Sequence, residues 1–405
     1  MRENWTTLSG DQIATKITKG SSPRWQGFEY QSDGLLFVTS ENVRDGFLDV
    51  SEPKFLPMEF SKKARASQLL HGDILINIVG ASIGRACRFL LDGVPANVNQ
   101  AVCVFRPKSD FDAEFLLQLF QAPHIQARLL GQRSDSARPN LSLTDFREFS
   151  FDLPPLPEQR KIAAILSAWD EAIEKLKALR AAKERRFSAV AQRLLAPSRA
   201  IGRHIPRSNW TPITFGEVFE ERQDRNQDLG PEDVITVGKY AIRKQSEHFS
   251  RSVASKDQSN YWTISSGDFV YDPMSAYYGA LGRFDGLKDG IVSPAYRVLR
   301  LSPDVHSEFM VQLLRSHHIR FLLEARSSQG NKEGKRRLLQ RDEFASIEYN
   351  MPPIETQKEI AQKLSCFRND IIVSERQIEA LTRQKRGLMQ KLLTGEWPVQ
   401  VEDAA

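Results

Sequence analysis

The stretch PPLPEQRKI at residues 154–162 occurs a second time, as PPIETQKEI at residues 352–360, and this repeat decides the fold of the chain. The two copies lie 198 positions apart, and at the same offset Leu166 corresponds to Leu364. A period this long predicts two similar structural units rather than one. The length of 405 residues agrees, because it exceeds what one ordinary hydrophobic core supports.

Each copy of the stretch opens a long helix. The prolines end a preceding strand, because their φ is fixed and they lack an N–H donor. Residues 158–195 and 355–393 contain no proline, and their only glycine is Gly387. Apolar residues recur at alternating spacings of three and four, and Ser374 and Lys385 fill gaps in the second series. This heptad pattern predicts that the helices pair as a coiled coil; the alternative is two amphipathic helices, each packed on its own domain.

Each long helix follows a domain in which strands and helices are mixed. Gly-Asp pairs at residues 72–73 and 267–268 precede β-branched and aromatic residues, a pattern typical of a strand. Residues 114–119 and 308–313 are amphipathic and predict one helix in each copy. The predicted parts are a first domain at residues 1–153, a long helix at 154–197, a second domain at 198–351, a second long helix at 352–396 and a tail at 397–405.

The connections predict the direction of the two long helices. The second domain starts soon after the first helix ends and finishes just before the second helix starts. A compact second domain brings those two helix ends to the same place, so the helices run antiparallel. The expected fold belongs to the α+β class: two similar mixed α/β domains joined by an antiparallel coiled coil, a tandem repeat with approximate two-fold symmetry.

The composition is typical of a globular protein, and the net charge is compatible with binding to nucleic acid. The hydrophobic fraction is 40%, the net charge is +5 and the pI is about 9.0, a mildly basic balance. No apolar run approaches the roughly 20 residues of a membrane helix, and we expect a cytoplasmic protein. Cys87, Cys103 and Cys366 are odd in number and lack CxxC spacing, so we expect buried, reduced thiols rather than disulfides or a zinc site.

Two related domains on a rigid spacer match the local two-fold symmetry of DNA. Such an object can read two half-sites on opposite strands at a fixed gap. The order of domain, PPxxxQ helix, domain, PPxxxQ helix resembles the specificity subunit of type I restriction–modification enzymes over essentially the whole chain. The stretches of the first copy that resemble the family's target-recognition domain are GSSP at 20–23, GDIL at 72–75, IGR at 83–85 and NQA at 99–101.

The resemblance implies a non-catalytic protein that selects the DNA site for partner subunits. Each domain would read one half of a bipartite, asymmetric site, and the coiled coil would set the gap and dock two methyltransferase subunits. The second copy has VSPAY at residues 292–296 where the first has NQA, so the two domains are expected to read different bases. No cofactor is expected in this chain; S-adenosylmethionine is expected in the methyltransferases, and ATP and Mg²⁺ in restriction and translocase subunits.

Candidate DNA-binding residues lie in loops that carry cations, amides or tyrosines. Lysine and arginine bind phosphates, while arginine, asparagine and glutamine can read base edges. The loop QGNKEGKRR at residues 329–337 is rich in glycine and basic residues, and GQRSDSAR at 131–138 is its counterpart. The predicted DNA-binding residues are Arg24, Gln26, Ser82, Arg85, Arg133, Arg138, Tyr277, Tyr278, Lys332, Lys335, Arg336 and Arg337.

Structural alternatives exist for these residues. The basic loops could be solvated, Ser82 and Arg85 could belong to a strand bulge, and one of the two tyrosines is expected in the core. Trp25, between two of the candidates, is interpreted as a packing residue. The predicted partner-binding residues are at the start of the long helices: Gln159, Arg160, Gln357 and Lys358.

Two other functions compete with DNA recognition. Pro303-Asp304 with Glu333-Gly334-Lys335 fits the loose PD…ExK pattern of metal-dependent nucleases, although the first copy has no equivalent acid pair. The chain could also be a coiled-coil adaptor that does not touch DNA. No P-loop of the form GxxxxGK[ST] is present. Specific DNA binding separates the three functions, because the adaptor would show none and the nuclease would cut unaided with Mg²⁺.

Overall fold

The computed structural model describes residues 4–131, 140–195, 209–227, 233–239, 241–248, 257–329 and 337–400. Its contacts divide the chain into two compact units. Unit 1 consists of Met1–Lys177 with Arg376–Ala405, and unit 2 consists of Ala178–Glu375. Each unit therefore contains one globular domain, one part of the first long helix and one part of the second.

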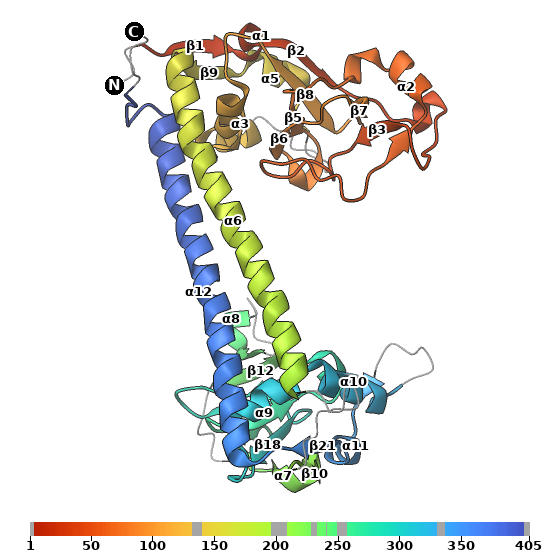
Figure 1. Ribbon diagram of the computed structural model, residues 1–405, viewed down its shortest axis with the longest axis vertical. Helices are drawn as coiled ribbons and strands as arrows, with labels where there is room; N and C mark the ends of the chain where they lie inside the picture. The colour runs from red at the N-terminus through yellow and green to blue at the C-terminus, as the bar shows by residue number, and fades with distance from the viewer. Residues whose placement is uncertain are drawn as a thin grey trace. The chain divides into compact units, whose positions relative to one another are not determined.

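Unit 1 is built on two sheets that pack against each other across a hydrophobic core. Its antiparallel sheet has the order β2-β8-β5-β6, and its second sheet has the order β4-β3-β7 with β3 and β7 parallel. The strands are β2 (Ala14–Lys19), β8 (Val102–Pro107), β5 (Ile74–Asn77), β6 (Ala86–Arg88), β4 (Phe55–Leu56), β3 (Leu35–Val38) and β7 (Ala96–Val98). Helix α3 (Ala113–Gln121) lies between the first sheet and the long helix of this unit (Figure 1).

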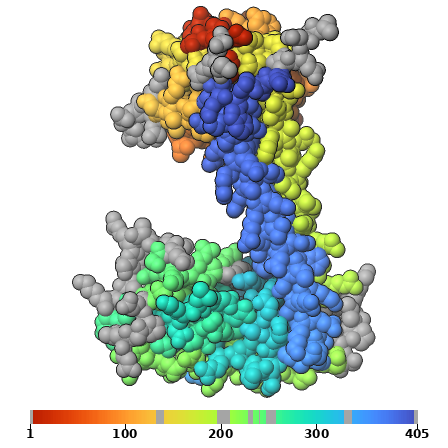
Figure 2. Space-filling model, turned by 90° about the vertical axis from the view of Figure 1, so that its left-hand side faces the viewer, coloured from red at the N-terminus to blue at the C-terminus, as the bar shows by residue number. Residues whose placement is uncertain are grey.

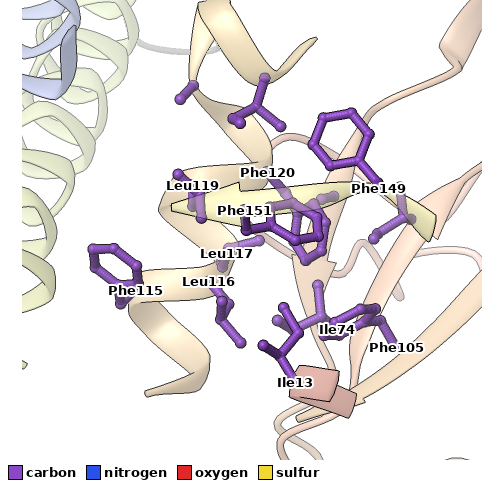
Figure 3. Close-up of a cluster of buried hydrophobic side chains, with 14 of the residues drawn as sticks. Ile13, Ile74, Phe105, Phe115, Leu116, Leu117, Leu119, Phe120, Phe149 and Phe151 are labelled. Carbon is purple, nitrogen blue, oxygen red and sulfur yellow. The ribbon is translucent and has the colours of Figure 1, made fainter. Parts of the chain in front are cut away.

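Strand β5 shows why this layering follows from the sequence. Ile74 and Ile76 point into the core beneath α3, and Leu75 points into the second core, between the sheets. This alternation is the period-two pattern of a strand covered on both faces. Figure 3 shows Phe120 of α3 beside the strand residue Phe151 in the first core.

Unit 2 repeats this plan. Its sheets have the orders β11-β18-β15-β16 and β13-β12-β17-β14, with β12 and β17 parallel. Phe269 and Tyr271 point into the core beneath α9 (Ser307–Leu314), while Val270 points into the other core. The strands are β11 (Phe219–Arg222), β18 (Arg297–Leu301), β15 (Phe269–Tyr271), β16 (Leu281–Arg283), β13 (Ala241–Lys244), β12 (Val234–Gly238), β17 (Gly290–Val292) and β14 (Trp262–Ile264).

Short elements complete both units. In unit 1 they are β1 (Thr6–Ser9), α1 (Gly10–Ile13), η1 (Arg24–Gln26), α2 (Met58–Lys63), η2 (Arg65–Ser67), η3 (Gly80–Ser82), α4 (Pro123–Gly131), α5 (Leu143–Glu148) and β9 (Ser150–Leu153). In unit 2 they are β10 (Thr211–Thr214), α7 (Phe215–Val218), α8 (Gln245–His248), η5 (Ala276–Tyr278), α10 (His317–Arg326), β19 (Ser328–Gln329), β20 (Arg337–Leu338), α11 (Arg341–Ala345) and β21 (Glu348–Met351). β1 pairs with β9 and β10 pairs with β21, so the start of each domain is fastened to its end.

The long helices are α6 (Leu156–Leu195) and α12 (Ile354–Leu393), and they pair within each unit. In unit 1 the early part of α6, with Ile162 and Leu166, shares a core with Leu392 of the late part of α12. In unit 2 the late part of α6, with Phe187, shares a core with Leu364 of the early part of α12. The predicted antiparallel pairing is therefore confirmed. In Figure 2 the blue end of α12 lies directly against the domain of unit 1.

A buried aspartate closes the same turn in both units. Asp73 accepts a hydrogen bond from the Leu70 amide at 2.8 Å and is held by the Arg106 guanidinium at 2.7 and 2.8 Å. Asp268 accepts from the Ser265 amide at 2.9 Å and pairs with Arg222. The preceding residues, Gly72 and Gly267, have φ of +89° and +95°, a conformation that L side chains rarely adopt.

The cysteines follow the sequence-based expectation in part. All three thiols are free, and Cys87 and Cys103 are buried as predicted. The prediction is wrong for Cys366, which is exposed on α12. Its helical position is next to the heptad seam rather than in it, so the residue faces solvent. Among the residues that the structure describes, no helix has both the length and the apolar character to cross a membrane.

Candidate nucleic-acid interface

In unit 1 the predicted residues Ser82 and Arg85 lie in the turn that follows β5. Asn77, the last residue of β5, is buried, and its Nδ2 donates hydrogen bonds to the Ser40 carbonyl at 2.9 Å and the Ser82 hydroxyl at 3.1 Å. A Cβ atom on Gly84, which has φ +89°, would lie 2.0 Å from the Gln126 Oε1. The turn after β5 is therefore fixed from both sides, and it presents the exposed Arg85.

The loop that carries Arg24 and Gln26 starts beside the turn at residues 98–100. Gly20 donates from its amide to the Asn99 carbonyl at 3.1 Å, and a Cβ atom on Gly20 would lie 1.7 Å from the Val98 carbonyl oxygen. Asn99 in turn donates to the Val38 carbonyl, two residues before Ser40. Backbone contacts thus place Gly20, at the start of this loop, beside the turn at residues 98–100, and the Ile78 amide joins the end of β5 to the Ala101 carbonyl just after that turn.

The segment that follows the basic loop of unit 1 is tied to the end of β5. The Leu141 amide donates to the Ile78 carbonyl at 2.9 Å, and Asn140 forms a bridge with Val79. The segment that directly follows residues 132–139 therefore meets the chain just past β5. The candidates Arg133 and Arg138 lie outside the described residues.

Unit 2 places its candidates at the equivalent strand end. Tyr277 and Tyr278 form η5 between β15 and β16, with ring centroids 5.5 Å apart at 83°. The Arg337 guanidinium lies 5.4 Å from the centre of the Tyr277 ring, so the structure brings these two predicted residues together. The Leu339 amide donates to the Pro273 carbonyl, which ties β20 to the end of β15. Lys332, Lys335 and Arg336 lie outside the described residues.

Two structural alternatives from the sequence are wrong. Neither tyrosine is a core residue, because Tyr277 is half-buried and Tyr278 is 41% exposed. Trp25 does not pack inside the domain and is 87% exposed. The apolar anchor of its loop is Phe28 instead, which contacts Phe60 edge-on at 5.5 Å.

The two units differ at the turn between β7 and β8 and its counterpart between β17 and β18. Unit 1 has Asn99 and the exposed Gln100 there, with an amide available to read a base. In unit 2 Tyr296 packs against the second core, and burial raises the pKa of its phenol. Gln100 and Asn77 are absent from the predicted site. The NQA stretch pointed to the first, and the polar end of an apolar strand pointed to the second.

The glutamines predicted to bind a partner are structural residues of the fold. Gln159 is buried, accepts a hydrogen bond from the Asp112 amide at 2.9 Å and donates to the Pro154 carbonyl at 2.8 Å. Gln357 repeats both contacts with the His306 amide and the Pro352 carbonyl, each at 2.8 Å. Each glutamine thereby fastens the proline turn to the start of α3 or α9, which explains the repeated PPxxxQ spacing.

The other two predicted partner-binding residues remain on the surface. Arg160 and Lys358, one position further along each helix, are exposed, and Lys358 pairs with Glu355 at 2.7 Å. A partner that docks on the start of α6 or α12 would therefore meet Arg160 or Lys358 and not the neighbouring glutamines.

The described residues contain no candidate metal centre. No group of three or more histidine, cysteine, aspartate or glutamate side chains among them is placed to hold a metal ion. Asp304, of the nuclease-like pattern, lies in an exposed turn, and Glu333 and Lys335 lie outside the described residues. The helix that follows Asp304 is α9, which begins at Ser307 with His306 as its N-cap.

Comparison with known proteins shows what the first domain is similar to. Residues 28–183 match the family model of the type I restriction modification DNA specificity domain. This segment is similar to the type I DNA specificity family. The matched segment contains most of the first domain, from the loop beside Trp25 to the middle of α6.

Curated relatives match parts of this chain. The EcoBI specificity subunit of Escherichia coli is 27% identical over 147 residues, which cover 35% of this chain and 31% of the relative. The MjaVIII specificity subunit of Methanocaldococcus jannaschii is 47% identical over 51 residues, 13% of this chain and 12% of the relative. The chain thus aligns with less than a third of the length of either relative.

Solved structures of type I systems share the fold over nearly the whole chain. A chain from a study of complex assembly and conformational transition of the type I R-M system has a TM-score of 0.60 at 16% identity, covering 98% of this chain and 99% of its own. The S subunit from M. genitalium has a TM-score of 0.54 at 15% identity, covering 98% and 97%. At these identities the likeness concerns the fold alone.

Proposed function

We propose that this chain is the sequence-specificity subunit of a type I restriction–modification complex, a non-catalytic protein that reads a bipartite, asymmetric DNA site. One observation carries the proposal. The strand end after β5 and its counterpart after β15 have the same backbone plan, but one displays Ser82 and Arg85 and the other Tyr277 and Tyr278. A shared scaffold with different surface side chains suits two readers of different half-sites.

The predicted residues divide by the part of the duplex that their chemistry fits. Arginine and lysine side chains bind phosphates and supply salt-dependent affinity. Arg24, Arg85 and Arg337 act in this way, together with Arg133, Arg138, Lys332, Lys335 and Arg336 in the loops at 131–138 and 329–337. Gln26 and Ser82 can exchange hydrogen bonds with base edges, and Tyr277 and Tyr278 can pack on sugars.

The partners follow from this role. Two methyltransferase subunits dock on the paired helices, where Arg160 and Lys358 are exposed, and bring S-adenosylmethionine. Restriction and translocase subunits bring ATP and Mg²⁺. The helices set the gap between the half-sites, and the complex works on DNA in the cytoplasm.

A domain exchange tests this proposal. Residues 1–150 are replaced by those of a relative, and the adenines methylated in the host genome are mapped with the methyltransferase subunits present. We expect one half of the methylated motif to change while the gap and the other half persist. The matched control replaces residues 209–351 and is expected to change only the other half.

Three results would contradict the proposal. A change in both halves after either exchange would show that the domains do not read separately. Specific DNA cleavage by this chain alone with Mg²⁺ would indicate a nuclease. Absence of sequence-specific binding, with and without the methyltransferase subunits, would indicate an adaptor.

A further inference from the structure

Trp25 is unusual because its large apolar ring is on the surface. Its exposed fraction of 87% compares with 54% for Trp397, and among the large hydrophobic residues that the structure describes only Leu287 is more exposed. An aromatic side chain can bury about 150–250 Å² of surface, so leaving it in water forgoes a large stabilisation. Such a residue is therefore suited to an intermolecular contact.

The loop holds Trp25 in a defined position. The amides of Gln26 and Phe28 both donate to the Pro23 carbonyl, at 2.9 and 3.0 Å, and Gly27 ends the turn with φ +77°. The Phe28 ring packs against the Phe60 ring, with centroids 5.5 Å apart, and the Lys63 ammonium lies 4.9 Å from the Phe28 centroid. Because the backbone of the turn is fixed before binding, a contact through Trp25 costs little backbone conformational entropy.

The surroundings of Trp25 favour DNA as the molecule that covers it. Gln26 donates to the Ser21 hydroxyl at 2.6 Å, beside the glycine that joins this loop to the turn at residues 98–100, so the loop is continuous with the candidate interface. Arg24 precedes Trp25 and is exposed, and Tyr30 is a second exposed aromatic residue of the loop. Flat rings beside a cation match the sugars, bases and phosphates of a duplex.

We propose that Trp25 contacts the target duplex directly and packs its indole ring against a sugar and base edge in the groove read by the first domain. This inference rests on the proposed function. The contact belongs to the first half-site alone, because the stretch after β11, QDRNQDLG at residues 223–230, has no aromatic residue. Its contribution comes from shape and apolar contact, and it adds affinity without adding a counterion-releasing charge.

Binding is measured with the full chain and its methyltransferase subunits on a duplex that carries the mapped methylation motif. Trp25→Ala is expected to weaken binding about tenfold, while the slope of log affinity against log salt stays unchanged. Trp25→Phe is expected to retain most of the affinity. Arg24→Ala, on the neighbouring residue, is expected to lower the salt slope by about one. Trp397→Ala is the matched control with no expected effect.

The outcomes separate this inference from the proposed function. If the wild-type complex binds its motif and Trp25→Ala binds equally well, the inference is overturned and the proposed function stands. If Trp25→Ala loses methyltransferase association but keeps its DNA affinity, Trp25 is a protein contact and the inference is overturned. If the wild-type complex shows no specific DNA binding, both are overturned. Unchanged thermal unfolding of the variants shows that each fold is intact.

Discussion

Unit 1 and unit 2 connect their domains to the long helices at the same positions, but with different charges. In unit 1 the connection is an ion pair. The Gln118 Nε2 on α3 donates to the Asp170 carboxylate on α6 at 2.8 Å, and the Lys385 ammonium on α12 reaches the same carboxylate at 2.6 and 2.7 Å. Lys385 is only 8% exposed, so the heptad gap that it fills is a buried polar contact.

In unit 2 the equivalent connection is a cation on an aromatic ring. The Gln312 Oε1 on α9 accepts from the Arg368 guanidinium on α12 at 3.3 Å, and that guanidinium lies 5.0 Å from the centre of the Phe187 ring on α6. Burial, reinforced by Arg315, lowers the pKa of Arg368. A glutamine amide suits both units because it can donate to a carboxylate or accept from a guanidinium.

The difference explains how each long helix selects its partner. Asp170 and Arg368 are 198 positions apart, and so are Phe187 and Lys385, so each pair occupies one repeat position. If two copies of α12 paired in this register, Arg368 would face Lys385. If two copies of α6 paired, Asp170 would face Phe187 and lose its cation. Only α6 with α12 satisfies both positions, a use of buried polar groups known from coiled coils.

The largest expected effect compares the two buried turn aspartates. Asp73→Ala leaves Arg106 with no carboxylate from this turn and should cost about 3 kcal/mol of unfolding free energy. Asp268→Ala should cost about 1 kcal/mol, because Arg222 also pairs with Asp224 at 2.6 Å. Chemical denaturation measures the total loss, and hydrogen exchange at β5 or β15 locates it. Equal losses in the two variants would mean that Asp224 does not compensate.

A charge reversal breaks the connection of unit 1. Lys385→Glu places two carboxylates together and should destabilise the protein by about 1–2 kcal/mol, a value reduced because Asp170 is partly exposed. Adding Asp170→Lys should restore most of the loss, as measured by thermal unfolding. A double variant no more stable than Lys385→Glu would show that the ion pair is not the source of the stabilisation.

Two substitutions in unit 2 test whether its connection can be replaced by the ion pair of unit 1. Phe187→Lys places an ammonium beside Arg368 and should destabilise the protein by about 1 kcal/mol through lost packing and repulsion. The second change Arg368→Asp recreates the ion pair of unit 1 and should recover part of this loss in the same melting experiment. Failure to recover would indicate that the positions, although equivalent in the repeat, are not interchangeable in their surroundings.

The smallest expected effect is on thiol labelling, which compares the two units in the unmutated chain. Burial raises the pKa of the Cys87 and Cys103 thiols of unit 1 to about 12, so almost no thiolate forms at pH 8. Cys366 of unit 2 is exposed and should react with a maleimide first, as read by mass spectrometry. Cys366→Ser should abolish this early labelling. Rapid labelling of Cys87 in the folded variant would show that unit 1 opens locally.

The fold could be predicted from the sequence because the features that indicate it are repeated or regularly spaced residues. The repeat, the heptad seam and the strand entries at Gly72 and Gly267 are patterns of neighbouring residues, and each predicted the element that the structure contains. The candidate interface was accessible only in part. Cationic and polar loop residues can be recognised by type, but Gln100 and Asn77 gain their importance from segments distant in the chain.

The sequence by itself determined that the chain is a duplication, that its long helices pair, and which loops carry cations, because these properties depend on local order and spacing. The tertiary structure alone decided which side chains are inside. Gln159 is buried and accepts a hydrogen bond from the amide of Asp112, 47 positions away, whereas Trp25 is exposed and it is Phe28 that packs against Phe60. Burial depends on partners brought together by folding, and no single stretch of sequence records them.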